Sequence, residues 1–125
     1  VAYSDIYNYK VLRVIDGDTI EFEAPFLPVE LKQVLHLRVM GVDTPEKGFR
    51  AYCDKERLLG KNATEFTTNL VKNAKVIKVE IIKWDKYGGR VLGDLILDDV
   101  RLSKKLLDSK VAVPYFGKKK PDWCK

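Results

Sequence analysis

Residues 14–23 of the chain read VIDGDTIEFE. In the second half of this stretch apolar residues alternate with polar ones, Ile20 and Phe22 against Thr19, Glu21 and Glu23. Such alternation is typical of a strand that buries one face. The Asp16-Gly17 pair stands between two apolar runs, where it is a common signal for a tight hairpin turn. The regular segment from about Tyr9 to Glu23 therefore predicts two strands joined by a turn.

The rest of the chain carries further periodic segments. Residues 31–42 alternate in the same way, and residues 75–83 and 91–97 are expected as two more strands. A helix is expected over residues 54–72, because four apolar residues recur on one helical face: Leu59, Ala63, Phe66 and Leu70. A short second helix is expected over residues 102–109.

The order of these elements indicates the class of fold. Three strands, a helix, two strands and a helix follow one another, without the crossover helices that a parallel sheet needs between each pair of strands. We therefore expect one domain over residues 1–125, a β-rich α+β fold. The expected architecture is a five-stranded OB-type barrel with one helix inserted between strands 3 and 4 and a short second helix. The apolar loop over residues 24–31 contains Pro25 and Pro28 and has no assigned role.

Composition narrows the class of partner. The 125 residues include 23 Lys and Arg against 18 Asp and Glu, a formal net charge of +5. A basic balance favours polyanionic partners, either nucleic acid or an anionic membrane surface. The hydrophobic fraction of 46% argues against wholesale disorder. Because the chain has no run of 18 apolar residues, no transmembrane helix is expected.

The two cysteines, Cys53 and Cys124, leave two interpretations open. One disulfide between them would tie the C-terminal tail to the body of the protein in an oxidising compartment. Alternatively, both are free thiols. Neither interpretation includes a structural zinc site, since the chain offers only one histidine, His36, in addition. His36 is expected on the surface of a strand or in packing.

Three motifs each allow a structural and a functional interpretation. The first, VIDGDT at residues 14–19, is either only a hairpin turn or a place where Asp16 or Asp18 offers a carboxylate oxygen to a cation. The second, VDTPE at residues 42–46, suits the start of a helix, with Thr44 as the N-cap. Its functional interpretation requires Asp43 to lie near the first motif.

The third motif, DKYGGR at residues 85–90, suits a Gly-Gly turn flanked by solvated charges. Functionally, Arg90 could present its guanidinium to a phosphate. Arg38 is similar, because an Arg in an apolar strand requires a partner or a place at the end of the strand. In the simpler interpretation Arg38 lies on the solvent face.

Taken together, the motifs supply the groups that phosphodiester hydrolysis requires. Asp18 and Asp43 could share a cation. Arg38 and Arg90 could stabilise the negative charge of the transition state. Glu46 could accept a proton from the attacking water or orient that water. Arg38 and Asp43 are five residues apart, so on an ideal strand they would point to opposite faces. We expect an irregularity at Gly41 that brings both to one site.

The chain resembles the staphylococcal nuclease (thermonuclease) family from about Tyr9 to Tyr115. The resemblance rests on three motifs in this order: VIDGDT, LRVMGVDTPE and DKYGGR. The resemblance implies an OB-type barrel and a calcium-dependent nuclease that acts on DNA and RNA and leaves 3′-phosphate ends. It implies calcium binding by the carboxylates of Asp18 and Asp43 and the backbone carbonyl of Thr44, with Asp16 acting through water at most. The remaining roles that it implies are Glu46 as general base or water-orienting residue, Arg38 and Arg90 as the phosphate clamp, and Lys86, Tyr87 and Tyr115 in the nucleotide pocket.

Two other functions stay open at this level. A catalytically silent OB-type module would bind nucleic acid with the same basic surface, although such modules normally lack some of the carboxylates or arginines. A carbohydrate-binding barrel fits the basic balance poorly. We also expect a monomer without a membrane partner. The sequence does not assign a compartment, and secretion or a periplasmic location suits a nonspecific nuclease best.

Overall fold

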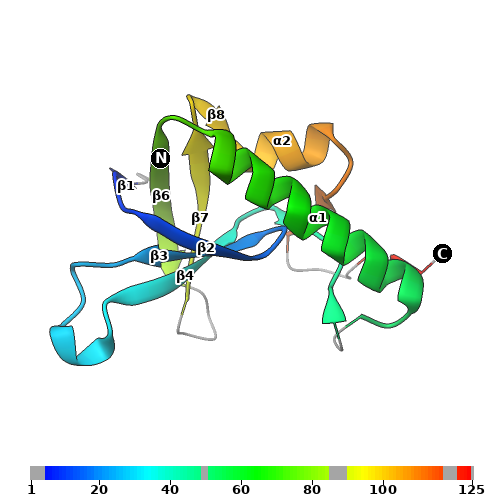
Figure 1. The fold of residues 1–125 in the computed structure, drawn as a ribbon, viewed down its shortest axis with the longest axis horizontal. Coiled ribbons are helices and arrows are strands. Elements are labelled where there is room, and N and C mark those ends of the chain that lie inside the picture. Colours follow the sequence, from blue (N-terminus) through cyan, green and yellow to red (C-terminus); the bar gives the residue numbers. More distant parts are fainter. Residues whose placement is uncertain (1–4, 49–50, 85–89, 117–120, 125) are drawn as a thin grey trace.

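The computed structural model describes residues 5–48, 51–84, 90–116 and 121–124 (Figure 1). Its strands are β1 (Asp5–Tyr7), β2 (Val11–Asp16), β3 (Thr19–Glu23), β4 (Val34–Val39), β5 (Val42–Asp43), β6 (Ile77–Trp84), β7 (Arg90–Leu97), β8 (Val100–Arg101) and β9 (Val113–Pro114). Its helices are α1 (Asp54–Asn73), α2 (Leu102–Asp108) and the short 3-10 helix η1 (Val29–Leu31). The predicted strand-rich fold with one long and one short helix is confirmed. The turn predicted around Gly88 and Gly89 lies outside the described residues.

The main sheet has the strand order β1-β6-β7-β4-β3-β2, with β8 paired to β7, and a second sheet consists of β5 and β9. Strands β4 and β7 run parallel, and the other pairs are antiparallel. The predicted hairpin is present, because β2 and β3 are joined by a turn at Gly17 and Asp18.

The closed five-stranded barrel is not confirmed. Among the described residues the main sheet forms an open path that ends in β1 and β2 rather than a ring. The physical reason is that the N-terminal segment breaks at residues 8–10, so its two parts pair with different strands, β1 with β6 and β2 with β3. The link from Tyr7 to Val11 reaches at most about 14 Å. The sheet must therefore curve until its two edges lie within that distance.

The core consists of buried side chains from the main sheet and from α2. The alternation predicted for β3 and β4 is confirmed from Ile20 to Glu23 and from Leu35 to Val39, where buried apolar side chains alternate with more exposed polar ones. Thr19, at the start of β3, is buried as well. Fully buried residues come from β3, β4, β6, β7 and α2: Ile20, Phe22, Leu37, Val39, Val79, Leu95, Leu102 and Leu106. Helix α1 crosses in front of the sheet, beside β2 (Figure 1).

The second motif does not begin a helix. Residues 44–47 have no regular structure, and α1 begins only at Asp54, with Cys53 as its N-cap. The backbone N–H of Thr44 donates instead to the Asp18 carboxylate at 3.3 Å. A tertiary contact has therefore taken the place of the local capping pattern. The interpretation of Thr44 as an N-cap is wrong.

The irregularity expected at Gly41 is present. Gly41 has φ of +86°, a backbone conformation that favours glycine. The chain turns at Met40 and Gly41, so that β5 leaves the line of β4. Strand β5 then pairs with β9, and the backbone N–H of Tyr115 donates to the Gly41 carbonyl at 2.9 Å.

The loop over residues 24–31 divides its apolar side chains between the core and the surface. Leu27 packs against the core, and the ring of Phe26 lies 5.5 Å from the ring of Tyr9. Gln33 closes the loop, because its side-chain amide donates to the backbone carbonyls of Pro25 and Leu27 at 3.2 and 2.8 Å. The loop, which had no assigned role from the sequence, is thus part of the packed structure.

A buried carboxylate holds the start of α2. Asp94 of β7 accepts hydrogen bonds from the backbone N–H and the hydroxyl group of Ser103, at 3.2 and 2.5 Å. Burial raises the pKa of Asp94, while the bonds from Ser103 act in the opposite direction. Glu80 on the neighbouring strand forms an ion pair with Arg101. Asp94, Glu80, Arg101 and Ser103 together connect β6, β7 and β8 to the start of α2.

The two cysteines form a disulfide, Cys53–Cys124, across 71 residues of sequence. It joins the residue that caps α1 to the C-terminal segment, and Figure 1 places that segment beside the first turn of the helix. Of the two interpretations that the sequence leaves open, the structure contains the bridge.

Because the bridge closes a long loop, it should stabilise the fold by restricting the unfolded chain. The double substitution Cys53→Ser with Cys124→Ser is expected to lower the free energy of unfolding by about 2 to 5 kcal/mol. Urea unfolding followed by circular dichroism measures the loss. Wild-type protein in excess dithiothreitol is the control and should lose the same amount. Equal stability of the oxidised and reduced protein would contradict the prediction.

Candidate functional site

The candidate site is centred on one guanidinium group held between two carboxylates. The Nη2 atom of Arg38 lies 3.3 Å from an oxygen of Asp18 and 3.3 Å from an oxygen of Asp43. Their side chains are 14%, 9% and 5% exposed, in that order. Because both oxygens touch one nitrogen atom, the two carboxylates converge on a single place in the fold.

The hairpin and α1 together hold Asp18. The hydroxyl group of Thr19 donates to one carboxylate oxygen of Asp18 at 3.1 Å, and the backbone N–H of Thr44 donates to the other. From the helix, the hydroxyl group of Thr67 donates to the Gly17 carbonyl at 2.6 Å. A Cβ atom on Gly17 would lie 2.8 Å from that of Ala63, so the close approach of turn and helix requires glycine here.

Two sheets meet at Arg38 and Asp43. Arg38 is the register partner of Thr19 across β3 and β4, which places it directly beside Asp18. Asp43 lies on β5 opposite Val113 of β9. The turn at Gly41 brings Asp43 back toward Arg38, as the spacing of these residues requires.

A carboxylate that sequence reasoning missed holds the segment of Glu46. Glu56 is 4% exposed and accepts the backbone N–H of Glu46 at 3.2 Å and that of Tyr52 at 2.8 Å. Its own backbone N–H donates to the sulfur of Cys53 at 3.4 Å. The position of Glu56, three residues after the N-cap, resembles a capping box and was the available signal.

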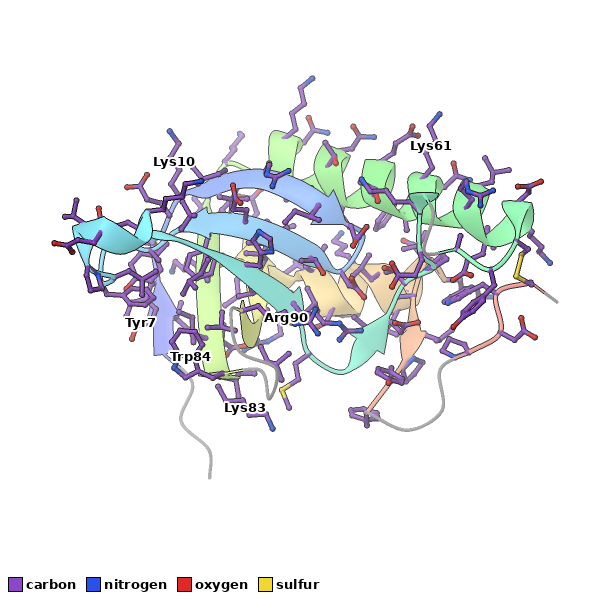
Figure 2. All side chains as sticks on the ribbon, turned by 90° about the horizontal axis from the view of Figure 1, so that it is seen from below. Tyr7, Lys10, Lys61, Lys83, Trp84 and Arg90 are labelled. Carbon is purple, nitrogen blue, oxygen red and sulfur yellow. A yellow bond between two sulfur atoms is a disulfide. The ribbon has the colours of Figure 1, made fainter. Side chains whose placement is uncertain are left out.

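Arg90 is the first residue of β7, and its register partner is His36 on the parallel strand β4. Registered residues of neighbouring strands point to the same face of a sheet, so Arg90 shares a face with His36 and Arg38. Along β4, Arg38 lies about 7 Å beyond His36. Figure 2 shows Arg90 beside the C-terminal part of β4. His36 itself contacts Glu21 at 3.2 Å, on the surface of the strand as expected.

The predicted nucleotide pocket is described only in part. Arg38 lies over the ring of Tyr115, with the guanidinium carbon 5.7 Å from the ring centre. This distance is typical of a cation–π contact. Lys86 and Tyr87 lie outside the described residues. Of the nine residues proposed for the site, the structure brings Asp18, Arg38, Asp43, Thr44 and Tyr115 into one connected group, with Glu46 two residues beyond Thr44.

The donor set suits a hard cation. Two carboxylates and one guanidinium give the centre of the site a formal charge of −1. In the described part of the chain no group of three or more His, Cys, Asp or Glu side chains could hold a metal ion. A cation here would need backbone carbonyls and water in addition, which calcium and magnesium accept and structural zinc does not.

Comparison with known proteins points to nucleases. The family model described as staphylococcal nuclease homologue matches residues 36–123. A thermonuclease of Staphylococcus hyicus is 36% identical over 111 residues, which cover 84% of this chain and 54% of the relative. An uncharacterized endonuclease of Escherichia coli is 30% identical over 99 residues, 79% of this chain and 54% of the relative. The chain spans about half the length of these curated relatives. No helix in the described residues is long and apolar enough to cross a membrane.

The contact between α1 and the segment of Glu46 yields a test. A Cβ atom on Gly60 would overlap the carbonyl group of Glu46 and lie 2.7 Å from the backbone nitrogen of Lys47. Gly60→Ala should therefore destabilise the protein by about 1 to 3 kcal/mol, despite the better helix propensity of alanine. Urea unfolding measures the change, with Lys61→Ala on the exposed side of the helix as the control. A Gly60→Ala protein as stable as this control would contradict the contact.

Proposed function

Because the chain belongs to the staphylococcal nuclease family, we propose that it is a calcium-dependent nuclease that hydrolyses phosphodiester bonds of DNA and RNA. The observation that carries the proposal is the contact of Arg38 with both Asp18 and Asp43. That contact joins a forked phosphate ligand and two hard cation ligands in one buried group.

Each residue has a proposed role in this reaction. Calcium held by Asp18, Asp43 and the carbonyl of Thr44 would supply positive charge to a phosphate oxygen of the substrate. Glu46 accepts a proton from the attacking water, or aligns that water opposite the leaving 5′-oxygen, so that the phosphate stays on the 3′ end. As the water oxygen bonds to phosphorus, the bond between phosphorus and the 5′-oxygen breaks, and the 5′-oxygen takes a proton from solvent water and leaves as a hydroxyl group.

The two arginines stabilise the charge that develops on the transferred phosphate. Arg38 offers five N–H donors, so it can keep a bond to Asp43 and still donate to a phosphate oxygen. Arg90 reaches the phosphate from the neighbouring strand on the same face of the sheet. Tyr115, together with Lys86 and Tyr87, lines the nucleotide pocket in this proposal.

The remaining proposals concern the molecule as a whole. The net charge of +5 favours a nucleic-acid substrate through its phosphates. We propose that residues 1–125 act as one domain and as a monomer. The Cys53–Cys124 disulfide supports an oxidising compartment, either outside the cell or in a periplasm.

A plasmid-nicking assay tests the activity itself. Supercoiled DNA should be nicked and then degraded in millimolar calcium, and EGTA should abolish the cleavage, because the site needs a second positive charge beside Arg38. Cleavage that persists in EGTA would reject the calcium requirement. Retardation of the plasmid in a gel without any cleavage would favour the silent binding module instead.

Replacement of the proposed base gives a second test. Glu46→Gln keeps the shape of the side chain and removes its ability to accept a proton, so kcat should fall about 10²- to 10⁴-fold while DNA still binds. Steady-state kinetics and fluorescence anisotropy with a labelled oligonucleotide measure the two quantities. Glu65→Gln, on the exposed surface of α1, is the matched control. Near wild-type turnover of Glu46→Gln would remove Glu46 from the mechanism.

A further inference from the structure

Asp43 has a second neighbour, Trp123, to which none of the three sequence motifs points. The indole Nε1–H of Trp123 donates to one carboxylate oxygen of Asp43 at 3.4 Å, and Arg38 donates to the other oxygen at 3.3 Å. Donors on both oxygens restrict the rotation of the carboxylate about its last torsion. The contact joins residues 80 positions apart.

The chemistry of this donor matters. An indole N–H only donates and carries no charge, unlike the guanidinium of Arg38. Trp123 can therefore orient Asp43 without neutralising it, and the negative charge of the carboxylate stays available to a cation. Neutral donors behind the ligands of a metal site orient those ligands in the same way.

A covalent bridge keeps Trp123 in this place. The next residue, Cys124, is bound to Cys53 at the N-cap of α1, and its backbone N–H donates to Asp122 at 2.9 Å. The other half of the bridge is connected to the second side of the site. The sulfur of Cys53 accepts the backbone N–H of Glu56, and the Glu56 carboxylate holds the backbone of Glu46.

We propose that Trp123 is a positioning residue for Asp43, and that the Cys53–Cys124 disulfide holds it there. In this inference, which rests on the proposed function, the bridge connects the cation ligand Asp43 and the segment of Glu46 to one anchor. Trp123 touches neither substrate nor cation. It acts only through the carboxylate that it orients.

A measurement on the metal-free protein tests the geometry without any activity. The chain has two tryptophans, so its ¹H–¹⁵N spectrum should contain two indole signals, which Trp84→Phe assigns. Asp43→Asn should shift the Trp123 signal and leave the Trp84 signal in place. Reduction of the disulfide by dithiothreitol should move the Trp123 signal to the position of a solvent-exposed indole. A Trp123 signal that ignores both changes would overturn the proposal.

A second measurement tests the consequence. Trp123→Phe keeps an aromatic ring and the disulfide but removes the donor, so calcium affinity by titration calorimetry and kcat on DNA should each fall about 10- to 100-fold. The midpoint of urea unfolding should stay close to that of the wild type, which a merely structural role would not predict. Trp84→Phe, at an exposed position on β6, is the matched control.

A double-mutant cycle tests whether the disulfide acts through Trp123. All the variants are measured under conditions in which they are folded. Cys53→Ser with Cys124→Ser should lower calcium affinity by at least as much as Trp123→Phe. Adding Trp123→Phe to that variant should then have little further effect, because the tether and the donor act as one unit. Fully additive losses, or wild-type calcium affinity and kcat in Trp123→Phe, would overturn the proposal. A wild-type protein that neither binds calcium nor cuts DNA would instead reject the proposed function, and the indole signals would still decide the geometry.

Discussion

The contact of Arg38 with Asp18 and Asp43 is the interaction on which the rest of this site depends. Two buried carboxylates repel each other, and desolvation adds to the cost unless a positive charge lies between them. Arg38 supplies one positive charge against two carboxylates, so the group has a formal charge of −1. The fold thus brings together a group of net negative charge around one guanidinium, and this charge supports the proposal that a cation and a phosphate bind here.

Helix α1 connects the stability of the fold to the geometry of the site. Small residues on the buried side of the helix let two other segments approach its backbone closely: Gly60 faces the carbonyl group of Glu46, and Ala63 faces Gly17. Thr67 adds a hydrogen bond to the turn that carries Asp18. Larger side chains at these positions would push the segments of Asp18 and Glu46 away from α1. The same residues therefore determine both the packing of the helix and the geometry of the site.

Much of the fold could be predicted from local patterns. The alternation in residues 19–23 and 34–39 and the helical spacing from Leu59 to Leu70 each reflect which face is buried, which a short window already contains. The turn at Gly41 followed from the spacing of Arg38 and Asp43. The prediction that a helix starts at Thr44 was wrong, because the Thr44 backbone N–H donates to the carboxylate of Asp18, which lies 26 residues earlier in the chain. The predicted closed barrel was not confirmed, because β1 and β2 on either side of residues 8–10 pair with different strands and the described sheet stays open between them.

The sequence by itself determined the longer strands and both α-helices of this protein, their order, and the residue types from which a phosphate site can be made. The short strands β1, β5, β8 and β9 did not follow from it. The tertiary structure alone decided which donor meets which oxygen: Trp123 on Asp43, Glu56 on the backbone of Glu46, and Cys124 on Cys53. The physical reason is the range of the forces involved. Backbone propensity and burial patterns act over a few neighbouring residues, whereas these partners, Glu56 and Glu46 excepted, lie 71 to 80 positions apart and meet only after the core has formed.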